Sequence, residues 1–168
     1  EVDSLGTDAS NGLNPLVDHS TYVNNAELIA YGSYTLPEEL HLNTAMVSTN
    51  NGFVTTGFSG DISLAGSNTF NMEGGNTATF SGVISGAGSL TTTNVGQVNL
   101  FGANTYSGGT TINEASGGIL NVNSSSSLGT GTITFNNTGE LDSTTNVNFN
   151  NALVFNTNTV KVGGGNTI

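Results

Sequence analysis

The sequence predicts an all-β fold, a right-handed parallel β-helix (β-solenoid) with an N-terminal capping segment. The first observation is composition: among 168 residues there are 24 Gly, 25 Asn and 25 Thr. β-Branched residues favour strands, whereas Gly and Asn accept the positive φ angles of corners. The second is that the apolar runs are too short to bury a face alone, so each needs a similar neighbour stacked on it. The third is an internal sequence similarity: residues 64–70 and 100–106 are identical at four of seven positions.

Residues 1–58 differ from the remainder and are expected to form the N-terminal cap. They hold seven of the twelve acidic residues, both prolines and both histidines. The first coil of a solenoid exposes a strand edge and an open core, which an atypical terminal segment covers. Short helical turns are expected over residues 26–30 and 37–39. The competing interpretation of residues 1–58 is a separate small binding module.

Residues 59–168 are expected to form the coils of the β-helix. At three strands per coil, twelve short strands predict about four coils and a rod of ~20 Å. An antiparallel sandwich, the alternative, favours Asn-Gly hairpins, and this dipeptide occurs only at residues 11–12 and 51–52. The final Gly-rich run, 163–168, resembles a corner leading into another strand, so the stack is expected to be truncated there. The expected strands are 62–64, 78–80, 83–84, 90–92, 98–101, 110–112, 119–122, 132–135, 141, 147–149, 153–155 and 160–162.

The centre of this region is the stretch 100–112. We expect a short strand, a tight turn over residues 102–105, Tyr106 as an aromatic plug, a Gly-Gly corner and a second short strand. The Gly-rich run 82–88 is expected to be another corner, because no lysine follows it as in a phosphate-binding loop.

Charge excludes several kinds of partner. The net charge is −11, and Lys161 is the only basic residue of the sequence. Nucleic-acid binding requires several Lys or Arg residues to neutralise phosphates, and docking onto anionic lipid requires the same. No apolar run reaches the ~18 residues of a membrane span, so a membrane-embedded chain is not expected. The absence of cysteine excludes disulfides and thiolate metal sites.

Candidate catalytic groups are few. Residues 57–61 lack the final glycine of a G-x-S-x-G nucleophile elbow. His19 and His41 lie near acidic residues, but a triad is recognised by geometry, and surface imidazoles on polar turns are the expected interpretation.

The acids of the coil region are expected to lie singly on a solvated face. Glu140 and Asp142 lie two residues apart and share one strand face, which offers at best a weak cation site. The sequence therefore predicts no catalytic residue, no cofactor and no metal. The acids concerned are Asp61, Glu73, Glu114, Glu140 and Asp142.

The threonines and the aromatic residues each suggest a binding surface, as the alternative to a purely structural role. Threonines at 91–93, 110–111, 132 and 134 allow a flat ice-binding face, but such an array recurs once per coil and the sequence spacing is irregular. Aromatic residues allow a sugar-binding stripe, although packing in the core or over corners is expected. The aromatic residues are Phe70, Phe80, Phe101, Tyr106, Phe135, Phe149 and Phe155.

Residues 87–113 resemble the passenger-associated repeat of bacterial type V autotransporters. The resemblance covers about residues 64–138, and the run Leu128 to Phe135 resembles the usual continuation of the repeat. A Thr-Thr-Asn-Val run replaces the customary Lys-Thr-Gly. The matching positions are Gly88, Leu90, Gly96, Leu100, Gly102, Asn104, Thr105, Tyr106, Gly108, Thr110, Ile112, Gly118 and Leu120.

This resemblance implies a secreted or surface-displayed β-helical passenger of a Gram-negative bacterium. The expected function is a non-catalytic stalk or adhesin that attaches to host or neighbouring cells, through protein or glycan on their surfaces. Self-association of like chains is a variant of this function. The alternative is a fragment of a secreted hydrolase or toxin whose active residues lie elsewhere.

Overall fold

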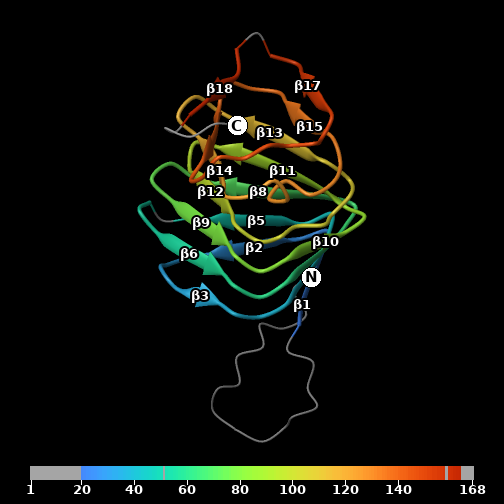
Figure 1. The fold of residues 1–168 in the computed structure, drawn as a ribbon. Coiled ribbons are helices and arrows are strands. Elements are labelled where there is room, and N and C mark those ends of the chain that lie inside the picture. Colours follow the sequence, from blue (N-terminus) through green and yellow to red (C-terminus); the bar gives the residue numbers. More distant parts are fainter. Residues whose placement is uncertain (1–19, 51, 158, 164–168) are drawn as a thin grey trace, which may run out of the picture.

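Each strand pairs with the strand one turn later in the chain, so the fold is a parallel β-solenoid of about six turns (Figure 1). The computed structural model describes residues 20–50, 52–157 and 159–163. No helix occurs among these residues, and every strand pair is parallel. The predicted all-β fold, a parallel β-solenoid, is confirmed.

The strands form three sheets along the axis of the stack. Sheet A contains β1 (Thr21–Asn24), β4 (Leu40–Asn43), β7 (Ile62–Ala65) and β10 (Ile84–Gly86). Sheet B contains β2 (Glu27–Ala30), β5 (Met46–Thr49), β8 (Ser67–Met72), β11 (Ser89–Asn94), β13 (Thr110–Glu114), β15 (Ile133–Phe135) and β17 (Leu153–Phe155). Sheet C contains β3 (Thr35–Leu36), β6 (Thr55–Phe58), β9 (Thr77–Phe80), β12 (Gln97–Leu100), β14 (Ile119–Val122), β16 (Glu140–Ser143) and β18 (Lys161–Val162).

Coil length varies along the stack. Leu28 pairs with Val47, 19 residues later, and Val47 pairs with Phe70, 23 residues later. The likeness between residues 64–70 and 100–106, 36 residues apart, is therefore not the coil repeat. Leu64 lies in β7 of sheet A and Leu100 in β12 of sheet C, so the two similar segments occupy different sides of the solenoid.

The core consists of inward-facing side chains stacked coil upon coil. Phe80 lies between Phe58 and Phe70, with ring centroids 4.6 and 4.0 Å away. All three rings are at most 1% exposed. Tyr106 is fully buried as the predicted plug, and its hydroxyl lies 2.6 Å from Thr110 Oγ1. Each strand thus buries its short apolar face only because the next coil covers it.

Buried asparagines stabilise the corners between sheets. The side-chain oxygens of Asn68, Asn76 and Asn104 accept hydrogen bonds from backbone N–H groups of the preceding coil, at 3.0, 3.1 and 2.8 Å. Asn104 also donates from Nδ2 to the carbonyl of Ser127, at 2.6 Å. All three are about 1% exposed, and they satisfy main-chain groups that the strand ladders leave unpaired where the chain turns.

Coil pairing begins well before the predicted boundary between residues 58 and 59. Six strands, β1 to β6, lie between Thr21 and Phe58 and belong to the same three sheets. The stretch 26–30, expected to form a helical turn, contains β2, and 37–39 is not helical. The acidic composition suggested a cap, whereas alternating burial in β1 and β4 is that of half-buried strands. Only residues 1–19 remain for a cap, and they lie outside the described residues.

Within residues 59–163 most of the predicted strands are present, with three differences. The coils are shorter than expected, so this stretch holds five levels of sheet B, from β8 to β17, rather than about four coils. Residues 147–149 do not form a strand. The stretch 67–72, whose Ser, Asn and Thr resemble a turn, is instead strand β8, because Asn68 is the buried corner residue at its start.

Candidate functional site

Sheet A brings one histidine next to a serine and a glutamate. Register places Tyr22, His41 and Ser63 in one outward column of β1, β4 and β7. His41 Nδ1 lies 2.6 Å from Ser63 Oγ, and its Nε2 lies 3.6 Å from Glu39 Oε1. The Tyr22 ring stacks on the imidazole with centroids 4.3 Å apart. The sequence did not reveal this contact, because Ser63 is one coil away from His41.

Acyl transfer requires more than a serine beside a histidine. A serine nucleophile needs backbone or side-chain donors aimed at the oxyanion that forms. Ser63 lies in β7, which pairs with β4 on one side and β10 on the other, so backbone donors around it are engaged in the sheet. Glu39 is half exposed at 51%. The four side chains therefore form a polar and aromatic stack on a sheet surface.

The carboxylates of the coils do not converge. Asp61 Oδ1 accepts a hydrogen bond from the N–H of Val83 in the next coil, at 2.8 Å. Glu140 and Asp142 share the outward face of β16, as predicted. Within the described ranges no group of three or more His, Cys, Asp or Glu residues could hold a metal ion. His19 lies outside the described residues.

The burial of Glu114 contradicts the prediction that the acids of the coils lie on a solvated face. Glu114 is the last residue of β13, points inward and is 0% exposed. Neither carboxyl oxygen has a hydrogen-bond partner of good geometry, and the buried hydroxyl of Thr92 also has none. Burial raises the pKa of Glu114 to about 7, and the nearby Thr92 hydroxyl offsets part of that rise. The predicted strand ended at residue 112, whereas β13 continues to Glu114, and the alternation from Thr110 and Ile112 places this carboxylate on the inward face.

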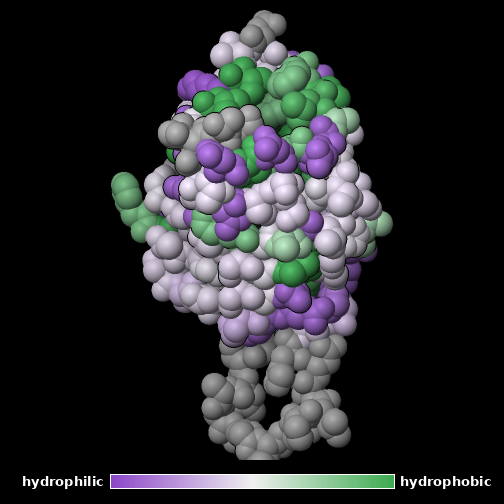
Figure 2. Space-filling model, viewed as in Figure 1, coloured by the Kyte–Doolittle hydropathy of each residue, from purple (hydrophilic) through white to green (hydrophobic). Residues whose placement is uncertain are grey.

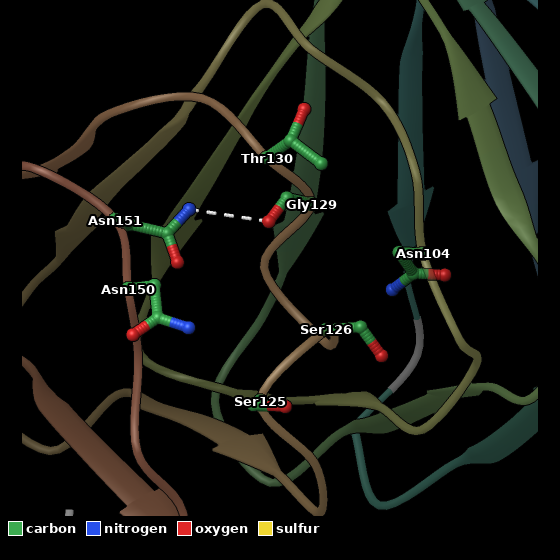
Figure 3. Close-up of a pocket in the computed structure, with 7 residues that line it drawn as sticks. All are labelled: Asn104, Ser125, Ser126, Gly129, Thr130, Asn150 and Asn151. Atoms are coloured by element: carbon green, nitrogen blue, oxygen red, sulfur yellow. Dashed lines mark hydrogen bonds between the residues drawn. The ribbon is translucent and has the colours of Figure 1, made fainter.

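A polar hollow of about 250 Å³ lies beside the loop that precedes β15 (Figure 3). No charged residue lines it, so it offers only neutral hydrogen-bonding groups. Asn151 Nδ2 donates to the carbonyls of Gly129 and Gly131, at 3.1 and 2.6 Å. The amide of Asn104 is likewise engaged with the backbone. The lining residues are Asn104, Ser125, Ser126, Gly129, Thr130, Asn150 and Asn151.

The outer face of sheet B presents a regular array of polar side chains. Register stacks Thr69, Thr91, Thr111 and Thr134 in one column across β8, β11, β13 and β15. Two residues further along, Asn71, Thr93 and Asn113 form a second column. The sequence analysis set a threonine face aside because its spacing is irregular. The four threonines are 22, 20 and 23 residues apart, and only the register aligns them.

Hydrophobic surface gathers at the end of the stack that holds β15, β17 and β18 (Figure 2). Phe155 stacks on Phe135 with centroids 5.2 Å apart, yet it is 55% exposed. The other exposed residues there are Leu153, Val154 and Val162. Of the predicted aromatic residues, Phe70, Phe80, Tyr106 and Phe135 are buried, as expected for a core role.

Comparisons with known proteins identify no similar protein. No family model, curated protein or solved structure matches this chain. The parallel solenoid itself therefore carries the functional argument. In the part of the chain that is described, no helix is long and apolar enough to cross a bilayer.

Proposed function

We propose that the chain is a non-catalytic segment of an autotransporter passenger, displayed at the surface of a Gram-negative bacterium as a stalk or adhesin. The observation that supports this is the uninterrupted parallel stack of about six turns. At ~4.8 Å per coil, six turns extend the chain by ~29 Å along one axis. A passenger of this kind holds its binding surfaces at a fixed distance from the cell that carries it.

Attachment to cells rests on the outward columns of the solenoid. Sheet B offers hydroxyl and amide groups, and sheet A offers the Tyr22–His41 stack. Such groups suit polar, hydrated ligands, the chemistry of cell-surface glycans and glycoproteins. Self-association between like chains is the variant of this proposal in which the ligand is a second copy.

The experiment presents the purified full chain on fluorescent beads to epithelial cells and to bacteria that express the same chain. We expect beads to be retained on one of these surfaces, and an excess of free chain to displace them. Retention no greater than that of albumin-coated beads would reduce the function to a passive stalk. Digestion of intact bacteria with a non-specific protease tests display, since a surface-exposed chain is degraded while cytoplasmic proteins survive.

The Ser63–His41–Glu39 arrangement is the one observation that favours the alternative of a secreted hydrolase. A fluorophosphonate probe distinguishes the two functions, because it labels only activated serines. We expect no labelling of the native chain. Labelling that disappears in Ser63→Ala would replace the adhesin proposal with a hydrolase.

A further inference from the structure

From β8 to β15 the outer face of sheet B repeats one residue type at the same position, between Met46 of β5 and Val154 of β17. Four consecutive coils place threonine at the same position. The matching column of sheet C contains Thr77, Gln97, Ile119, Glu140 and Lys161 in succession. Stacking alone therefore does not require threonine, and the repetition on sheet B needs another explanation.

The array is regular in two directions. Neighbouring strands of a sheet lie ~4.8 Å apart, and residues i and i+2 of a strand lie ~6.6 Å apart on the same face. Thr91 and Thr93 of β11 thus begin a rectangular net, which Thr111 and Asn113 of β13 continue one coil further. Oxygen atoms in the surface planes of hexagonal ice repeat at comparable distances.

The hydroxyls of the threonine column are free to bind water. None of Thr69, Thr91, Thr111 or Thr134 hydrogen-bonds through its hydroxyl to another described residue. In the second column Thr93 Oγ1 donates to the carbonyl of Asn113 at 3.5 Å, and Asn71 Oδ1 accepts from Asn94 Nδ2 at 3.0 Å. All four side chains are partly exposed. Each presents a hydroxyl that exchanges hydrogen bonds with water and a methyl group that restricts the motion of the water beside it.

Charge is excluded from this face although the chain has a net charge of −11. From β5 to β17 the outward positions of sheet B contain no charged residue, and Glu27 of β2 is the only acid of that sheet's outer face in the described chain. Fixed charges hold their own hydration shells, which do not fit a neutral crystal. An uncharged face on an acidic protein is thus complementary to a neutral lattice.

We propose that the outer face of sheet B binds ice, through the columns Thr69–Thr91–Thr111–Thr134 and Asn71–Thr93–Asn113. Small soluble ligands occupy concave sites with converging polar groups. None of these seven residues lines the polar hollow beside β15. An extended crystalline surface is the ligand that a repeating face of parallel columns contacts at every coil. This inference goes beyond cell attachment and does not depend on the autotransporter assignment.

The test uses the full chain in an ice-affinity experiment. A polycrystalline ice shell is grown slowly in a dilute solution, and protein is measured in the ice and in the remaining liquid. Thermal hysteresis and the shape of single ice crystals are recorded in parallel. We expect the native chain to be enriched in the ice fraction and to shape the crystals, whereas albumin stays in the liquid.

Two substitutions at the centre of the array locate the surface. Thr91→Lys adds a hydrated charge, and Thr91→Tyr adds bulk without charge, in a strand that tolerates aromatic residues. Both are expected to lose nearly all enrichment in ice. The matched controls are Thr77→Lys and Thr77→Tyr, at a partly exposed outward position of β9 in sheet C, and both are expected to retain it. Circular dichroism checks that each variant is folded.

Three results would overturn the proposal. One is a native chain that stays in the liquid, and another is equal loss in the Thr91 and Thr77 variants. The third is a chain that lacks ice uptake but self-associates in sedimentation and is dissociated by Thr91→Lys, which would assign the face to a second copy. Cell attachment is measured separately, so its failure and that of ice binding are distinguishable.

Discussion

The buried carboxyl of Glu114 predicts that the solenoid is more stable in acid than at neutral pH. Burial shifts its pKa from the ordinary 4.5 to about 7 in the folded chain. Between these values the folded state holds a proton that the unfolded state has released, so rising pH favours unfolding. The stabilisation is complete below about pH 4.5, declines up to about pH 7, and changes no further above it.

The size of this effect follows from the shift. Each pKa unit corresponds to ~1.4 kcal/mol, so the carboxyl of Glu114 costs ~3 kcal/mol of stability above pH 7 relative to acid. Glu114→Gln keeps the shape and removes the titration, although its buried amide still lacks partners at a cost of ~1–3 kcal/mol. The variant is therefore less sensitive to pH rather than more stable at every pH.

Urea unfolding followed by circular dichroism from pH 4 to 9 measures the prediction. The difference in unfolding free energy between the native chain and Glu114→Gln is expected to change by ~3 kcal/mol across this range. Taking the difference removes the titration of the other acids. Glu73→Gln, at an exposed corner residue, is the matched control for the removal of one negative charge. A constant difference between native and Glu114→Gln proteins would refute the reasoning.

Three further substitutions test the packing of the stack by chemical unfolding. Asn104→Ala removes a buried amide that bonds two coils and should cost ~1–3 kcal/mol, because the N–H of Ile84 is left unpaired. Phe80→Ala leaves a cavity between two stacked rings and should cost ~3–5 kcal/mol. Gly86→Ala places a Cβ against the carbonyl of Leu64 at φ +102°, and the strain should cost at least ~1–3 kcal/mol.

An exposed asparagine provides the control for the first of these changes. Asn137→Ala, in the turn before β16, should be nearly neutral. If Asn104→Ala were equally neutral, the corner asparagine would not join the coils. If Gly86→Ala left stability unchanged, the inference that the backbones of Gly86 and Leu64 approach closely would be wrong.

The sequence reveals individual strands better than it reveals their alignment. Ile119–Val122 was predicted with its observed bounds, because alternating apolar residues mark a half-buried strand whatever its neighbours are. Strand β8 was missed, because Asn68 satisfies the backbone of another coil and that role is invisible in local propensity. The strands between Thr21 and Phe58 were missed because acidic residues and prolines obscured their alternation.

The candidate binding surfaces depend on register, which the sequence does not supply. The threonine column and the contact of His41 with Ser63 both require knowing which residues lie one coil apart. Coils of 19 to 23 residues remove any fixed period from which to infer this. The prediction that nucleic acid is not a partner needs no register, because it rests on net charge, which acts regardless of alignment.

The unequal coil lengths have a practical consequence for engineering. Extra residues are accommodated at corners, and the columns remain aligned above and below them. Gly117, between β13 and β14, has open space where a side chain would be, so a foreign peptide placed there would project from the solenoid. One residue added within β13 would instead turn its inward side chains outward. The corners between sheets thus provide sites for displaying epitopes at successive levels, ~4.8 Å apart along a rigid support.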